Sequence, residues 1–264
     1  MASSVFSLVF SLFSGLPPLI TLIPISLLLG IGMLWIFSKT SNQEAIRRVK
    51  ARLQAHLYEM RLFADEPVLI WKAQLGLLAA NAHYIGLMLI PAIVASAPLI
   101  LILAQLECFY GLEPIPVGRD AIVTARLRDG AEPSACALRA PSGIAVETPA
   151  VWIPQDHEIS WRVRAIGPTS GDLELVFPSG SVAKSIRSGD GPQYVSGRRV
   201  SSLLDLIWNP GESRLSGGPV DWISVNYPRA AVRALGVDLH WLVWLLAVSM
   251  IAALLLKGRF RVSF

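Results

Sequence analysis

Three long apolar stretches without a charged side chain constrain this chain more than any other feature. They cover residues 19–37, 84–106 and 239–256. Each has close to the roughly 20 residues that an α-helix needs to cross the hydrocarbon core of a bilayer. The composition agrees, because 53% of the residues are hydrophobic, 16% are charged and the mean hydropathy is +0.52. The sequence therefore predicts an integral membrane protein with three spanning helices.

The basic residues predict the orientation, because Lys and Arg near the ends of spans tend to stay in the cytoplasm. Residues 38–83 hold seven of them, and the tail 257–264 adds three more. In the long segment 107–236, basic and acidic residues nearly balance. We therefore expect a multi-pass protein of the cell inner (plasma) membrane, with the N-terminus outside and the C-terminus in the cytoplasm. The formal charge of +4 then reflects topology, and no nucleic-acid partner is expected.

The N-terminal segment 1–14 is apolar with one polar stripe. Its four serines are spaced by three and four residues, which places them on one side of a helix. This spacing predicts an amphipathic helix in the membrane interface, closed by Gly15, Pro17 and Pro18. The alternative is an apolar tail that extends the first span.

Residues 41–83 have the pattern of a cytoplasmic coiled-coil hairpin. Ser41 and Glu44 fit a capping box at the start of a first helix, and 64–67 (Ala-Asp-Glu-Pro) stops it. Apolar residues follow a 3,4 spacing in both arms, with His56 as the one polar step of the first arm. The predicted seam of the first arm is Ile46, Val49, Leu53, His56, Met60 and Phe63, and that of the second is Val68, Trp71, Leu75, Leu78 and Ala82.

The second arm contains no breaker before the second span, so hairpin and span should form one helix. Uncharged polar residues lie along it at or near membrane depth, where each costs free energy unless it faces protein or water. They are Gln74, Asn81 and His83 on the cytoplasmic side and Ser96 deeper. One interpretation is that they satisfy one another in helix packing. The other is that Asn81 and His83 line a wet recess open to the cytoplasm.

From residue 111 the pattern changes to short alternating runs separated by Gly and Pro. Seven strand candidates within 111–187 predict an extracytoplasmic all-β domain that resembles a sandwich. Residues 188–236 contain one short helical candidate and read as a segment that returns to the membrane. His240, Trp241 and Trp244 then open the third span, where such side chains favour the headgroup level.

Few residues suggest chemistry. The four histidines have no second ligand at metal spacing, so no metal or other cofactor is expected. Ser181-Val-Ala-Lys184 matches the Ser-x-x-Lys pattern but lies in a strand context, and Gly30 and Gly32 suit close helix packing. Cys108 and Cys136 both face the outside and could pair, although sequence gives no distance between them. We expect a protein that is not an enzyme.

The order of these parts resembles the YidC/Oxa insertase superfamily. An outer helix, a span, a basic cytoplasmic hairpin, a second span with proline and a third span ending inside are shared with its three-span members, such as archaeal YidC-like proteins and the third subunit of the endoplasmic reticulum membrane complex. The local similarity is in 80–98, which contains Met88, Pro91 and a second proline. The absence of a basic residue in any span and the β-domain before the third span depart from the family and fit a divergent bacterial relative.

The resemblance implies a function in membrane insertion. In that family a groove between the spans lets hydrophobic segments enter the bilayer, and the hairpin receives the client. Carried over, residues 53–83 would be the receiving hairpin, with Asn81 and His83 at the mouth of the groove, and the partners would be lipid and nascent membrane proteins. The alternative is a non-catalytic scaffold whose β-domain binds an envelope partner or complex.

Overall fold

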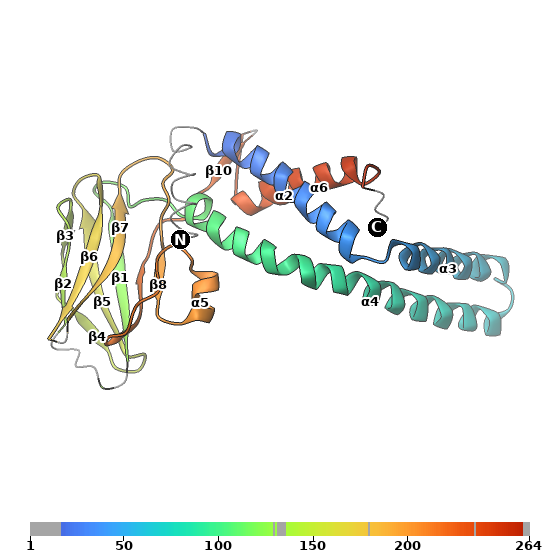
Figure 1. Ribbon diagram of the computed structural model, residues 1–264, viewed down its shortest axis with the longest axis horizontal. Helices are drawn as coiled ribbons and strands as arrows, with labels where there is room; N and C mark the ends of the chain where they lie inside the picture. Colours follow the sequence, from blue (N-terminus) through green and yellow to red (C-terminus); the bar gives the residue numbers. More distant parts are fainter. Residues whose placement is uncertain (1–16, 129, 131–135, 179, 235, 261–264) are drawn as a thin grey trace. The chain divides into compact units, whose positions relative to one another are not determined.

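The computed structural model describes residues 17–128, 130, 136–178, 180–234 and 236–260, and it divides into two compact units. One unit combines 1–22 with 100–244 and contains the β-domain; the other combines 23–99 with 245–264 and is helical. Figure 1 shows the elements of both. The expected interfacial helix 1–14 lies outside the described residues.

Four helices carry the apolar stretches and the hairpin. They are α2 (Pro18–Thr40), α3 (Gln43–Leu62), α4 (Pro67–Leu106) and α6 (Trp241–Leu256). Helix α2 and the segment that begins with α4 are long and apolar enough to cross a membrane, whereas α6 is apolar but has only 16 residues. The described residues therefore contain two helices of spanning length and a third, shorter apolar helix where the sequence predicts a third span.

The hairpin of α3 and α4 forms as predicted, but its first helix is capped one residue later than expected. The side chain of Asn42 accepts a hydrogen bond from the Ala45 amide at 3.0 Å, so Asn42 is the N-cap. Ser41 instead donates its hydroxyl proton to the Phe37 carbonyl, which belongs to the last turn of α2. The capping box at Ser41 was therefore wrong. Pro67 begins α4, where a missing amide proton costs nothing.

The seam of α3 is the predicted one. Ile46 and Val49 are buried, and Leu53, His56 and Met60 continue the same face half-buried. Phe63 follows the helix as its C-cap and is exposed, so it does not belong to the seam. The 3,4 spacing of apolar residues thus identified the inward face of this helix up to its last turn.

The seam of α4 lies on the face opposite to the predicted one. Ala73 and Ala80 are buried and Gly76 is half-buried, which places small residues at a 3,4 spacing against α3. A Cβ added at Gly76 would lie 2.6 Å from Cε1 of His56, so the glycine provides the room for that ring. The small residues at this seam leave room for side chains of α3, such as the His56 ring.

Helices α2 and α6 cross closely at Gly30. A Cβ on Gly30 would lie 2.7 Å from the backbone oxygen of Ser249, whereas a Cβ on Gly32 would meet nothing within 4 Å. The buried side chains of Ser26 and Leu34 lie one turn on either side of Gly30. The expected packing role therefore holds for Gly30 and not for Gly32.

The β-domain consists of two main sheets and a small ribbon (Figure 1). The larger sheet has the order β3-β5-β1-β9-β8, with β4 also paired to β5, and the smaller has the order β2-β6-β7. A separate antiparallel pair joins β10 to β11. The strands are β1 (Asp120–Leu127), β2 (Ala137–Arg139), β3 (Ile144–Val146), β4 (Val151–Ile153), β5 (Glu158–Ala165), β6 (Thr169–Phe177), β7 (Gly180–Ser188), β8 (Arg198–Val200), β9 (Val220–Val225), β10 (Val232–Ala234) and β11 (Val237–Leu239).

The period of two in the strands produces the core of this domain. Alternate residues of β1 and β5, such as Val123 and Trp161, are buried together with Leu173 and Leu175 of β6 and Ile186 of β7. Side chains of both sheets therefore meet in one apolar core, as in a sandwich. All seven strand candidates of 111–187 are present as β1 to β7.

The domain extends beyond its predicted end at residue 187. Strand β9 pairs with β1 in the middle of the larger sheet, and β8 pairs with β9 at the edge. Between them the chain forms the short helix α5 (Leu203–Trp208), which is the helical candidate of the return segment. Residues 188–225 are therefore part of the β-domain, and only the piece after β9 returns to α6.

The ends of the apolar helices that adjoin the β-domain are tied together by polar side chains. After α4 the chain makes one π-helical turn, η1 (Glu107–Gly111). The Tyr110 hydroxyl donates to Thr21 of α2 at 2.7 Å, and Nε1 of Trp241 at the start of α6 donates to Glu107 at 2.8 Å. This outer junction, made of Thr21, Glu107, Tyr110 and Trp241, fixes three helix ends on the β-domain side.

Candidate functional site

The polar residues predicted to line a groove lie on different sides of α4. Gln74, Asn81 and His83 are exposed, and Ser96 donates its hydroxyl proton to the Ile93 carbonyl within its own helix. His56 is held elsewhere, between Gly76 and the carboxylate of Glu59, at 2.8 Å from the latter. The described residues thus do not gather these five side chains into one site.

A stripe of large apolar side chains occupies the outer face of α4. At 100° per residue, this stripe lies opposite to the seam at Ala73, Gly76 and Ala80. Trp71 and Leu78 keep 63% and 64% of their surface exposed. We call this set the outer stripe of α4: Val68, Trp71, Leu75, Leu78, Ile85, Leu89 and Ile93, all of them exposed.

The outer stripe contains four of the five residues that the sequence assigned to the second seam. Helix α4 is apolar on nearly its whole circumference, so hydrophobic spacing does not distinguish its faces. The predicted seam Val68, Trp71, Leu75, Leu78 and Ala82 was therefore wrong, since all five residues are exposed. Gln74 and Asn81 border this stripe on one side and His83 on the other, as their positions on the helix require.

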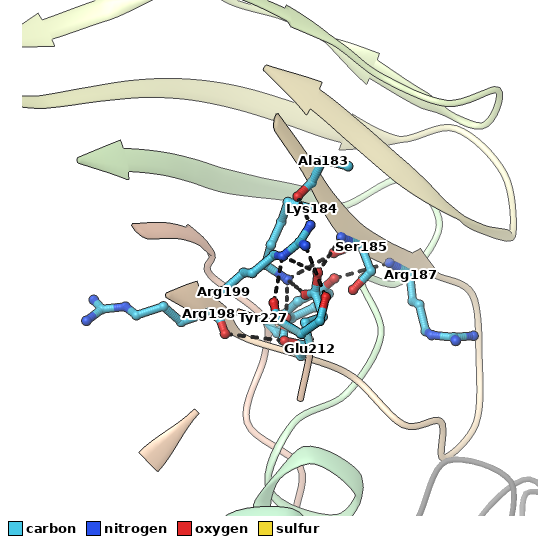
Figure 2. Close-up of polar contacts among 10 residues, drawn as sticks. Ala183, Lys184, Ser185, Arg187, Arg198, Arg199, Glu212 and Tyr227 are labelled. Carbon is cyan, nitrogen blue, oxygen red and sulfur yellow. Dashed lines mark hydrogen bonds and ion pairs between the residues drawn. The ribbon is translucent and has the colours of Figure 1, made fainter. Parts of the chain in front are cut away.

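A polar cluster in the β-domain surrounds the buried side chain of Lys184 of β7 (Figure 2). The Lys184 side chain is 0% exposed. Its ammonium group donates to the Ser196 carbonyl, to the Ser185 carbonyl at 3.1 Å and to the carboxylate of Glu212. All three protons of the ammonium group therefore have acceptors.

Glu212 and Arg199 complete the cluster from the segments on either side of α5. Glu212 also accepts from the Ser185 amide at 3.1 Å, and Arg199 donates to the carbonyls of Ala183 and Ser213. We call Lys184, Arg199 and Glu212 the buried clamp. It joins β7 to β8 and to the segment that follows α5, which are separate pieces of chain.

Burial and pairing act on both titratable ends of the clamp. Burial lowers the pKa of Lys184, an effect that the Glu212 carboxylate opposes. Burial favours the neutral form of Glu212, but the charge and hydrogen bond of Lys184 and the Ser185 amide outweigh it and hold the pKa of Glu212 below its usual range. Glu212 is therefore ionised at neutral pH.

The clamp has the geometry of a structural cross-link. Lys184 presents no free proton site to a substrate, because its three donors are used within the protein. Ser181, the partner in the Ser-x-x-Lys pattern, lies on the exposed part of the same strand. Within the described residues, no group of three or more His, Cys, Asp or Glu side chains is placed to hold a metal ion. Sequence spacing could not reveal the clamp, because 28 residues separate Lys184 from Glu212.

The two cysteines are separate and unbonded. Cys108 is buried at the end of α4, and Cys136 is buried next to β2 within the core of the β-domain. Burial in that apolar setting raises the pKa of Cys136 to about 11. The cysteine pairing that the sequence left open is thus not present, and both thiols are shielded by packing.

The expected headgroup anchors of the third span are used inside the protein. Trp241 is only 1% exposed, because its ring packs in the outer junction and its Nε1 bonds Glu107. Trp244 donates to the Val232 carbonyl at 3.2 Å, and His240 accepts from the Leu242 amide at 3.3 Å. An aromatic belt was therefore the wrong interpretation of Trp241, whose polar edge meets a carboxylate of the same chain.

Comparisons with protein-family models, with curated proteins and with solved structures find no match to this chain. The functional argument consequently rests on the residues of this chain, and the most distinctive surface among the described residues is the outer stripe of α4.

Proposed function

We propose that the protein spans the bilayer three times and helps hydrophobic segments of other membrane proteins to enter it, as an insertase-like membrane chaperone. The observation that carries this proposal is the length of the apolar helix α4. Helix α4 has 40 residues, which at 1.5 Å per residue is about 60 Å, roughly twice the thickness of the hydrocarbon core. Lipid chains can cover one half of such a helix when it crosses the membrane.

The remaining half is the hairpin arm, which keeps the same apolar character. Trp71, Leu75 and Leu78 lie before the predicted start of the span at residue 84 and are exposed. Exposed large apolar groups in a row mark a binding surface or a membrane contact. A hydrophobic segment arriving from the cytoplasm could bind to this arm and pass along the same stripe into the bilayer without meeting a charged side chain.

Two further features support this assignment. The exposed surface of α3 carries Arg47, Arg48, Lys50 and Arg52, which suits a hairpin on the cytoplasmic side. The stripe is bordered by Gln74 and Asn81, whose amides can bond the polar flank of a client while its apolar part contacts Leu78. No nucleotide or metal enters this mechanism, since apolar burial supplies the driving force.

Photo-crosslinking tests the proposal. A photoreactive residue placed at Leu78 or Asn81 of the full chain should capture newly made membrane proteins in membranes that support insertion. The same residue at Lys50, an exposed charged position on the flank of α3, is the matched control and should capture few.

Three outcomes would reject the proposal. They are no adduct at Leu78 and Asn81, equal capture at Lys50, or lipid adducts alone. A stoichiometric envelope partner that co-purifies with the full chain and is lost when the whole β-domain, residues 118–225, is deleted would instead favour the scaffold interpretation.

A further inference from the structure

Helix α5 of the β-domain exposes its apolar side and turns its other side toward the domain. Leu203 and Leu204 are 65% and 75% exposed, and Ile207 and Trp208 are exposed beside them. At 100° per residue these four side chains share an arc of about 140°. Leu206, on the opposite side, is half-buried. In an ordinary soluble domain, a short surface helix packs its apolar side against the domain and exposes its polar side.

The loop that carries α5 starts and ends beside the outer end of α4. On the way in, the Val195 amide donates to the Cys108 carbonyl at 2.7 Å, and the Tyr194 hydroxyl donates to Gln105 of α4 at 2.8 Å. After α5 the chain comes back beside Ser196. A Cβ added at Gly211 would lie only 2.6 Å from Cβ of Ser196, so the two backbones are in close contact there. The loop 197–210 therefore has both of its ends fixed at the point where α4 enters the β-domain.

The buried clamp holds the base of this loop. Arg199 stands before α5 and Glu212 after it, and both bind to β7 through Lys184 or Ala183. From Ser196 to Leu203 the chain has seven residues, which cannot reach more than about 25 Å even when extended. If the outer end of α4 lies at the membrane surface, the start of α5 is therefore no more than about 25 Å from that end.

We propose that α5 is a membrane-surface anchor: its apolar face inserts into the headgroup and upper acyl region of the outer leaflet and holds the β-domain against the bilayer. The residues fit this partner, since Trp208 is of the type enriched at bilayer interfaces and leucines supply apolar area. Arg198, at the start of the loop, and Arg214, four residues after its end, are exposed, and their guanidinium groups can bind lipid phosphates.

The anchor rests on the proposed membrane insertion but not on the client-binding activity. It requires only that α4 reaches the outer surface near Cys108. A six-residue helix buries too little apolar area to bind a bilayer alone. The spans already hold α5 close to the membrane surface, so its effective concentration there is high and a weak interaction is sufficient.

Depth-dependent quenching tests the anchor. An environment-sensitive fluorophore is attached to single cysteines, Leu204→Cys, Ser181→Cys and Ile93→Cys, in the full chain reconstituted into phosphatidylcholine and phosphatidylglycerol vesicles. Cys108 and Cys136 are buried, so labelling of the folded protein favours the introduced thiols. Spin-labelled lipids then quench from a shallow or a deep position in the acyl chain. All three replaced side chains are exposed, so the variants should fold.

We expect a blue-shifted emission at position 204 with at least twofold stronger quenching by the shallow than by the deep label. Position 181, at the far end of β7, should remain water-like, and position 93 in α4 should be quenched by the deep label. Emission at 204 that matches 181 would overturn the anchor, as would a blue shift without lipid quenching, which would mean that protein covers α5. Failure at position 93 would instead contradict membrane insertion and the proposed function with it.

Discussion

The β-domain and the helical hairpin place their bulky apolar side chains in opposite directions. In the β-domain, Trp161 and Leu175 point between the sheets and are buried by the domain itself. In the hairpin, Trp71 and Leu78 point outward, and the inward seam of α4 is made of alanine and glycine. The first region completes its own core. The second leaves its largest apolar groups exposed, so its free energy depends on what surrounds it.

The largest effect expected from this comparison is in the buried clamp. Glu212→Ala would leave the Lys184 ammonium group buried without its counter-charge, which typically costs about 3–5 kcal/mol. Unfolding of the β-domain followed by near-ultraviolet circular dichroism should show this loss. Glu174→Ala, which removes an exposed carboxylate of β6, should stay within about 0.5 kcal/mol of the parent. Equal stabilities would mean that the clamp does not hold the domain.

Acid should weaken the β-domain through the same carboxylate. The pKa of Glu212 in the folded state is lower than its ordinary value of 4.5, so its contribution is complete above that value and is lost as the pH falls through the folded pKa. A double variant with an apolar pair, Lys184→Met with Glu212→Leu, removes both charges and should unfold with a weaker dependence on pH below 4.5. Parallel acid profiles of parent and double variant would contradict this assignment.

The glycines of α2 provide a matched pair in the helical unit. Gly30→Ala would push a methyl group against the backbone of Ser249, which cannot rotate away, and overpacking of this kind costs about 1–3 kcal/mol. Gly32→Ala meets open space and should be neutral or slightly stabilising. Thermal unfolding in mild detergent would separate the two. A similar effect of both substitutions would contradict the close crossing of α2 and α6.

The smallest effect on stability is expected in the outer stripe of α4, because its large apolar side chains are exposed. Leu75→Ser with Leu78→Ser replaces two exposed leucines of the outer stripe, so the unfolding free energy in detergent should change by no more than about 0.5 kcal/mol per site. Client capture at Asn81 should nevertheless fall severalfold, because the apolar contact is lost. A large loss of stability would show that the stripe belongs to the internal packing of the hairpin.

Sequence periodicity predicted the β-domain better than the helices for a physical reason. The long strands β1, β5, β6 and β7 alternate between a buried and a more exposed face, so their pattern is visible residue by residue. Helix α4 is apolar on both faces, and spacing alone assigned its seam to Trp71 and Leu78 instead of Ala73 and Ala80. The small residues at 73, 76 and 80 were the available signal, because close helix contacts select for them.

Features formed by distant pieces of chain were not visible in the sequence. Strand β9 joins the middle of the larger sheet from a segment rich in glycine and serine, and its partner β1 lies about a hundred residues earlier. The hydrogen bond between Trp241 and Glu107 likewise links residues far apart, so the sequence suggested only the general tendency of tryptophan for interfaces. Local patterns predict which face of an element is apolar, but they do not predict the distant residue to which a polar side chain will form a hydrogen bond.

The burial of Lys184 has a practical consequence for following this protein in a native membrane. The chain has five lysines, and the other four, Lys39, Lys50, Lys72 and Lys257, are exposed and lie outside the β-domain. Amine-reactive reagents should modify those four at once and Lys184 only when the β-domain opens. Mass spectrometry of a single labelling time course would therefore report the opening rate of the β-domain at one peptide, with four internal standards on the same molecule.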